Sequence, residues 1–227
     1  MNTKKRKLKS NDGEIFEIEE SCLQLVQYFK NLSKDYPNPK KEILLNSINW
    51  KTLDKIIDYL KHYQNEKPKE IKKKNILYDE LIEFLDEWDY NFIIVLPYDD
   101  CIDLLNGAKI LEIKELVDLV STKIASETLT IEINAKNYTN RHDIVDDIAD
   151  KLDIKWIDKN ANAFIDWMRD LGWIDPKIVK IIINIILPKH KPRKKIKNLD
   201  DLIETFNEII IPEQTTRKLE VNWINLE

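Results

Sequence analysis

The clearest pattern of apolar and polar positions in this chain lies between Trp88 and Ala125. Apolar residues recur there three and four positions apart in two runs, which places each run on one face of a helix. The two runs are Cys101, Leu104, Leu105 and Ala108, then Ile113, Leu116, Val117, Val120 and Ile124. They predict two amphipathic helices joined at Leu111–Lys114. Because each apolar stripe needs a partner, the segment is either buried core or core plus a docking surface.

Residues 1–60 show a different pattern. Asn11, Asp12 and Gly13 tolerate the left-handed backbone of tight turns, so residues 1–20 predict a β-hairpin. A short strand is predicted over Glu42–Leu45, and Asn49 is expected to cap a helix with the apolar residues Trp50, Leu53, Ile56, Ile57 and Leu60. Strands and helices in this order predict an α+β fold, with a small sheet covered by helices.

Residues 128–197 again show helical spacing. One run is Ile144, Ile148 and Leu152, and another is Phe164, Ile165, Met168 and Leu171. Gly172 is expected to end the second helix, and Asp175-Pro176 to begin another. The segment Ile178–Leu187 is apolar on all sides, which predicts a buried helix. We therefore expect a small helical subdomain.

Composition narrows the function classes. A net charge of −5 argues against a dedicated nucleic-acid binder, and three glycines cannot build a phosphate cradle. The three histidines are too far apart in sequence for a metal-ligand motif. No apolar run reaches the ~20 residues that span a membrane. We expect no catalytic residues, no metal, no cofactor, no nucleic-acid or membrane partner, and a cytoplasmic or nuclear location.

Several segments, in their order along the chain, resemble the Skp family, the S-phase-kinase-associated adaptors of SCF ubiquitin ligases. Elongin C is a more distant relative. The segments are Ser10–Ile18, Trp50–Tyr63, Trp88-Asp89 with Phe92, and the pattern Leu104 or Leu105, Ala108, Leu111, Ile113, Lys114, Leu116 and Asp118. Leu199–Asn207 is similar to the family's first F-box-docking helix, and Pro212–Trp223 to its terminal helix. The resemblance implies a BTB/POZ fold and a non-catalytic adaptor role.

The resemblance implies three domains: a BTB/POZ Skp-like domain at 1–127, a helical insert without a family counterpart at 128–197, and C-terminal F-box-docking helices at 198–227. F-box proteins and a cullin are the partners it implies. The implied F-box-docking residues are Ile113, Leu116, Leu202, Ile203, Phe206, Asn207 and Trp223. The implied cullin-facing residues are Lys109 and Ile110.

Lys109 and Ile110 depart from the family pattern, which has an asparagine–tyrosine pair there that meets the cullin. Two functions therefore stay open. The first is an adaptor that links a cullin to F-box substrate receptors for ubiquitin-dependent degradation. The second is a BTB-fold interaction module that binds F-box or other partners without a cullin, as a decoy or competitor. An enzyme within 128–197 is disfavoured, because that segment has no cysteine and no nucleophile–base spacing.

Overall fold

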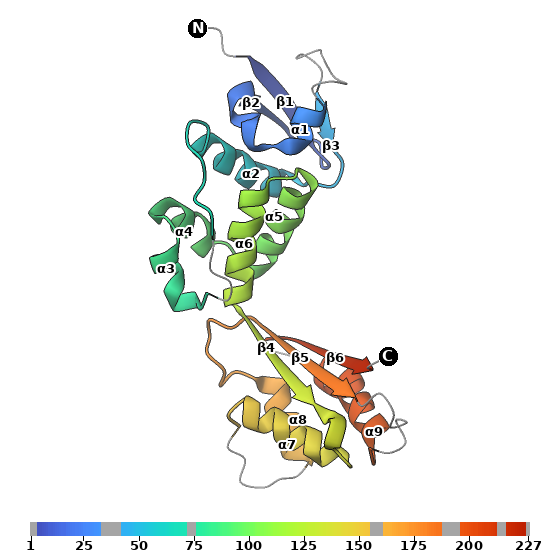
Figure 1. Cartoon of the computed structure of the whole chain (residues 1–227). Helices are drawn as coiled ribbons and strands as arrows, with labels where there is room; N and C mark the ends of the chain where they lie inside the picture. The colour runs from blue at the N-terminus through green and yellow to red at the C-terminus, as the bar shows by residue number, and fades with distance from the viewer. Residues whose placement is uncertain are drawn as a thin grey trace. The chain divides into compact units, whose positions relative to one another are not determined.

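A computed structural model describes residues 4–32, 42–71, 76–154, 161–187, 196–212 and 217–225. The chain forms two compact units, unit 1 over Met1–Ser126 and unit 2 over Glu127–Glu227. Figure 1 labels the helices and strands of each unit. Helices and small sheets occur together in the chain, which confirms the α+β class.

The sheet of unit 1 begins with the predicted hairpin. β1 (Lys5–Ser10) pairs antiparallel with β2 (Ile15–Glu19), and β3 (Ile43–Leu45) pairs parallel with β1. Gly13 has a φ of 97°, which only glycine adopts without strain, and this explains its place in the turn. The Asp12 carboxylate accepts a hydrogen bond of 3.0 Å from the Trp50 backbone N–H and so ties the turn to the following helix.

The helices of unit 1 cover this sheet and each other. The 3₁₀ helix η1 (Glu20–Leu25) and α1 (Gln27–Leu32) follow the hairpin, and α2 (Trp50–His62) follows β3. The Asn49 side chain accepts the Thr52 N–H at 2.9 Å, which confirms the predicted cap of α2. Further along the chain lie η2 (Tyr78–Glu80), α3 (Leu81–Phe84), α4 (Glu87–Ile94), α5 (Tyr98–Ile110) and α6 (Lys114–Ser126).

The predicted helix pair is α5 and α6. On α5, Cys101, Leu104 and Ala108 are buried, and on α6 Leu116 and Val120 are buried. Glu112 adopts a φ of 55° between the helices, so the chain turns sharply there. Most of the apolar stripe therefore belongs to the core of unit 1, which was one of the two alternatives for this segment.

Unit 2 contains a three-stranded sheet with only parallel pairing. β4 (Thr128–Asn134), β5 (Lys180–Leu187) and β6 (Lys218–Asn225) lie in the order β4-β5-β6. The 3₁₀ helix η3 (Ala135–Asn137), α7 (Arg141–Lys151) and α8 (Ala161–Asp170) connect β4 to β5. α9 (Leu199–Glu204) and the π-helix η5 (Thr205–Ile210) connect β5 to β6.

The prediction of a buried helix within Ile178–Leu187 is wrong. Lys180–Leu187 is the central strand β5, and Asp175-Pro176 begins no helix. Most of this run is isoleucine, whose branched β-carbon favours strands. A mostly apolar run of this length, interrupted only by Lys180 and Asn184, fits a central strand as well as a buried helix, so periodicity alone could not decide between them. α8 ends at Asp170, two residues before the predicted stop at Gly172, and the residue that turns left-handed is Leu171, with a φ of 44°.

The prediction of a terminal helix over Pro212–Trp223 is also wrong. Lys218–Asn225 forms β6, which pairs with β5 from Lys180↔Lys218 to Leu187↔Asn225. The predicted boundary between 197 and 198 divides a single core, since Ile148, Ile183, Phe206 and Leu219 belong to one buried cluster. Residues 128–197 are thus part of an α/β unit rather than a helical insert.

The helices of unit 2 lie on one face of its sheet. The chain moves across the sheet in one direction, from β4 to β5 to β6, and right-handed crossovers then place both connections on the same side. Ile181, Ile183 and Ile185 on β5 are 0% exposed, whereas the residues between them are half-buried. The sheet therefore has one covered face and one face that remains accessible.

Candidate interaction surfaces

The end of α5 presents the two residues expected to face a cullin. Lys109 is exposed, and Ile110 is 42% exposed. The next residues turn inward, since Leu111 and Ile113 are buried and the Ile113 N–H donates to the Ala108 carbonyl at 2.9 Å. The local fold thus leaves an aliphatic side chain in solvent beside a cation, at the point where α5 ends.

A close helix contact supports this end of α5. Gly107 faces α2, and a Cβ at this position would lie 2.9 Å from both Ile56 Cδ1 and Thr52 Cγ2. Any larger residue would force the Ile56 or Thr52 side chain to shift. The contact packs α5 on α2 within the turn that precedes Lys109 and Ile110, so their position depends on the core of unit 1.

The seven predicted F-box-docking residues fall into two groups. Ile113 and Leu116 are buried in unit 1, and Leu202 and Phe206 are buried in unit 2. Unit 2 supplies the core in which Leu202 and Phe206 lie. Ile203 and Trp223 are half-buried, and Asn207 is exposed. These three retain surface that another protein could contact.

Aromatic rings explain why Phe206 is buried. Its ring lies 5.9 Å from the Phe164 ring of α8 and 6.1 Å from the Trp223 ring of β6, both edge-on. Such pairs favour this geometry and add to the stabilisation from buried area. Phe206 therefore joins both helical connections to the sheet, which is a structural role that a single-helix view of this segment could not predict.

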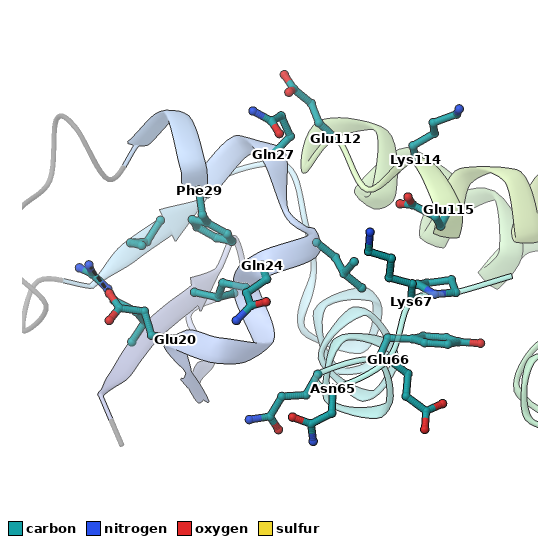
Figure 2. Close-up of a pocket in the computed structure, with 17 residues that line it drawn as sticks. Glu20, Gln24, Gln27, Phe29, Asn65, Glu66, Lys67, Glu112, Lys114 and Glu115 are labelled. Atoms are coloured by element: carbon teal, nitrogen blue, oxygen red, sulfur yellow. Dashed lines mark hydrogen bonds and ion pairs between the residues drawn. The ribbon is translucent and has the colours of Figure 1, made fainter. Parts of the chain in front are cut away.

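Unit 1 also contains a wide cleft of about 1130 Å³. Figure 2 shows the side chains around it, which come from η1 and α1, the loop after α2 and the start of α6. Polar and charged groups dominate, including Gln24, Glu66, Lys67, Glu112 and Glu115. Among the described residues that line the cleft there is no serine, threonine, cysteine or histidine. The cleft offers positive charges, negative charges and side-chain amides to a polar partner.

A buried carboxyl group was missed in the sequence. Asp89 is 4% exposed and accepts a hydrogen bond of 2.8 Å from the Tyr63 hydroxyl. Burial raises the pKa of Asp89, and the nearby Asp86 carboxylate raises it further, while the Tyr63 hydrogen bond opposes this. Trp88 stacks on His62 at 3.8 Å and on Phe92 at 4.9 Å beside this pair. The Trp88-Asp89 motif with Phe92 is therefore a structural element that holds α4 against α2.

Other chemistry is sparse in the described parts of the chain. No group of three or more His, Cys, Asp and Glu side chains comes together there in a way that could hold a metal ion. Cys22 and Cys101 are buried, and burial raises the pKa of the Cys22 thiol. No described helix is both long and apolar enough to cross a membrane.

The sequence of this chain is similar to those of known proteins. Residues 4–65, which extend from β1 to the loop after α2, match the family described as the Skp1 family, tetramerisation domain (Skp1 POZ). An S-phase kinase-associated protein 1 homolog of Tetrahymena thermophila is 33% identical over 130 residues, which is 54% of this chain and 72% of that protein. The chain belongs to the Skp1 family.

Plant members of the Skp1 family show similar agreement. SKP1-like protein 10 of Arabidopsis thaliana is 32% identical over 147 residues, or 63% of this chain and 88% of that protein. SKP1-like protein 17 of the same plant is 30% identical over 134 residues, or 59% of this chain and 81% of that protein. These relatives support the membership of the chain in the Skp1 family.

Proposed function

We propose that this Skp1-family chain is a non-catalytic adaptor that links a cullin to F-box substrate receptors in an SCF-type ubiquitin ligase. The observation that carries the proposal is membership of the Skp1 family, with a POZ match over residues 4–65 of unit 1. The last two residues of α5 are Lys109 and Ile110, and both are exposed. They stand at the position that meets the cullin in the family. The exposed aliphatic side chain of Ile110 offers apolar surface that such a contact could bury.

The cullin contact can be tested with the full chain and a cullin N-terminal domain. Isothermal titration should give a complex, and Ile110→Asp should weaken it by about tenfold or more, because a carboxylate would be desolvated in an apolar contact. Val95→Asp is a matched control, since Val95 is 74% exposed and precedes the first residue of α5, at the end opposite to Ile110. Equal affinity of the wild type and the Ile110 variant would exclude this surface.

The F-box contact is proposed to use the outer side of α9 and η5, where Ile203 and Asn207 keep exposed surface. Ile203→Asp should weaken binding of an F-box peptide in fluorescence anisotropy, while Ile209→Asp serves as a control on the same segment. Ile209 is 38% exposed and is not among the predicted contacts. Substitution of Phe206 would not test docking, because that side chain is 0% exposed in the core of unit 2.

A second candidate is an interaction module that has kept the POZ fold without cullin binding. One observation favours it: Lys109 and Ile110 stand where the family has the asparagine–tyrosine pair that meets the cullin. A gain-of-function variant separates the candidates. If Lys109→Asn with Ile110→Tyr creates cullin binding that the wild type lacks, the module without a cullin is correct. If the wild type already binds the cullin, this second candidate is wrong.

A further inference from the structure

The accessible face of the unit 2 sheet is formed by the even-numbered residues of β4, β5 and β6, and we call it the open face. The strand register aligns these residues in rows, including Asn184↔Asn222 and Ile186↔Ile224. Parallel sheets are usually covered on both faces, so a face left accessible is unusual. Ile224 is 40% exposed on it, and Ile182 and Ile186 are half-buried. Apolar side chains thus lie on this face beside polar ones.

A polar network crosses the open face between β5 and β6. The Asn222 amide nitrogen donates to Asn184 Oδ1 at 3.0 Å and to Glu220 Oε1 at 3.1 Å. Lys180 Nζ lies 2.6 Å from Glu220 Oε2. The pKa of Glu220 is lowered, first by the hydrogen bond from Lys180 and then by that from Asn222. Glu220 is therefore a fixed anion that holds Asn222, and Asn222 in turn orients Asn184.

The network leaves a defined pair of groups for another molecule. Both N–H groups of Asn222 are used, but within the described residues its Oδ1 has no partner, and neither does the amide nitrogen of Asn184. One acceptor and one donor are thus held on neighbouring strands, which lie roughly 4.8 Å apart. A residue in an extended chain directs its own N–H donor and its own carbonyl acceptor to the same side, so it complements this pair.

The neighbouring rows extend the same complementarity. Ile186 and Ile224 lie on one side of the asparagine row, and the Lys180–Glu220 ion pair lies on the other. From these contacts we propose that the open face of unit 2 binds an extended segment of another polypeptide. Its peptide groups hydrogen-bond to Asn184 and Asn222, and an aliphatic side chain of the segment packs on Ile186 and Ile224. This gives the chain a target-binding surface of its own, and it does not depend on cullin or F-box binding.

The same network also stabilises the sheet, because cross-strand polar pairs each contribute roughly 0.2–1 kcal/mol. A purely structural role would make loss of Asn184 lower the unfolding temperature without changing any binding. Ligand binding would instead make the affinity for a peptide fall while the fold persists. Binding and thermal unfolding must therefore be measured on the same variants.

The experiment uses the full chain and a phage-displayed library of random 12-residue peptides as the probe. Enriched peptides are synthesised, and their Kd is measured by fluorescence anisotropy. Asn184→Ala and Asn222→Ala should each weaken binding by about tenfold, the effect of one lost hydrogen bond. Ile224→Ser should weaken it as well. Asn137→Ala is the matched control and should leave the Kd unchanged, because Asn137 is exposed on η3 and outside the open face.

Four results would overturn the proposal. They are the absence of any enriched peptide, an unchanged Kd in both asparagine variants, hydrogen-exchange protection by the peptide in unit 1 instead of β5 and β6, and a concentration-dependent dimer that Asn184→Ala abolishes while no peptide binds. The last result would assign the open face to a second copy of the chain. Support requires weaker peptide binding in the asparagine variants at a temperature well below their unfolding transitions, where both variants are fully folded.

Discussion

At the residue scale, Asp89 shows how a family motif can have a structural role. Its carboxyl group is almost fully buried and is held by the Tyr63 hydroxyl. Because its pKa is raised in the folded protein from the ordinary 3.8, the folded state binds more protons than the unfolded state above that value. Ionised Asp89 therefore destabilises the fold at neutral pH, and this cost decreases as the pH falls toward 4.

Asp89→Asn removes the charge and keeps an oxygen that accepts the Tyr63 hydrogen bond. We expect its free energy of unfolding to exceed that of the wild type most at pH 7, with the difference shrinking as the pH is lowered to 4. Urea denaturation across this range measures both values. A difference that does not vary with pH would contradict the role assigned to burial. Asp89→Ala, by contrast, should cost about 1–3 kcal/mol, since it leaves the Tyr63 hydroxyl unsatisfied.

Gly107 is the residue on which the α2–α5 contact depends. Gly107→Val should destabilise unit 1 by about 1–3 kcal/mol, because the added atoms meet Ile56 and Thr52 at contact distance. Asn106→Val is the control, since it introduces the same β-branched side chain at an exposed position of the same helix. Thermal unfolding followed by circular dichroism compares the two variants. Equal losses would show that helix propensity, rather than packing, sets the cost.

At the scale of the elements, the sequence was most informative where apolar spacing was regular. The hairpin at Gly13, the Asn49 cap, the α5–α6 pair and α7 were all predictable, because turn residues, caps and helical periodicity act locally. β5 and β6 were not. Their sequences are rich in isoleucine or alternate in polarity, and they become strands through parallel pairing with strands that are distant in sequence. A short stretch of sequence does not contain the pairing partner.

The site residues divide in the same way. The exposure of Lys109 and Ile110 follows from their position at the end of a predicted helix. The burial of Leu202 and Phe206 does not, because it depends on a sheet that the sequence did not suggest. Asn184 and Asn222 carry no recognisable motif, and only the strand register brings them together.

Phe206 tests whether η5 belongs to a core or to a docking helix. Phe206→Ala should cost about 3–5 kcal/mol and lower hydrogen-exchange protection throughout β5 and β6, because it removes the ring between Phe164 and Trp223. Protection of α2 in unit 1 should persist. Trp167→Ala is the control and should cost about 1 kcal/mol or less, since Trp167 is 37% exposed. Full protection of unit 2 in the Phe206 variant would restore the docking-helix interpretation.

At the scale of the whole molecule, the chain combines a POZ-type unit of the Skp1 family with an α/β unit that has its own core. The C-terminal strand β6 is built into the parallel sheet of unit 2, where the sequence predicted a docking helix. The adaptor proposed here would therefore use unit 1 for the cullin. Unit 2 would contribute the outer side of α9 and η5 and the open face of its sheet.

The most direct test of the adaptor role is a reconstitution of the full chain with a cullin N-terminal domain and an F-box protein, analysed by size-exclusion chromatography with multi-angle light scattering. The adaptor role predicts one peak whose mass equals one copy of each component, and Ile110→Asp should release the cullin while the F-box protein stays bound. A mixture in which the cullin elutes alone beside the wild-type chain would contradict the role.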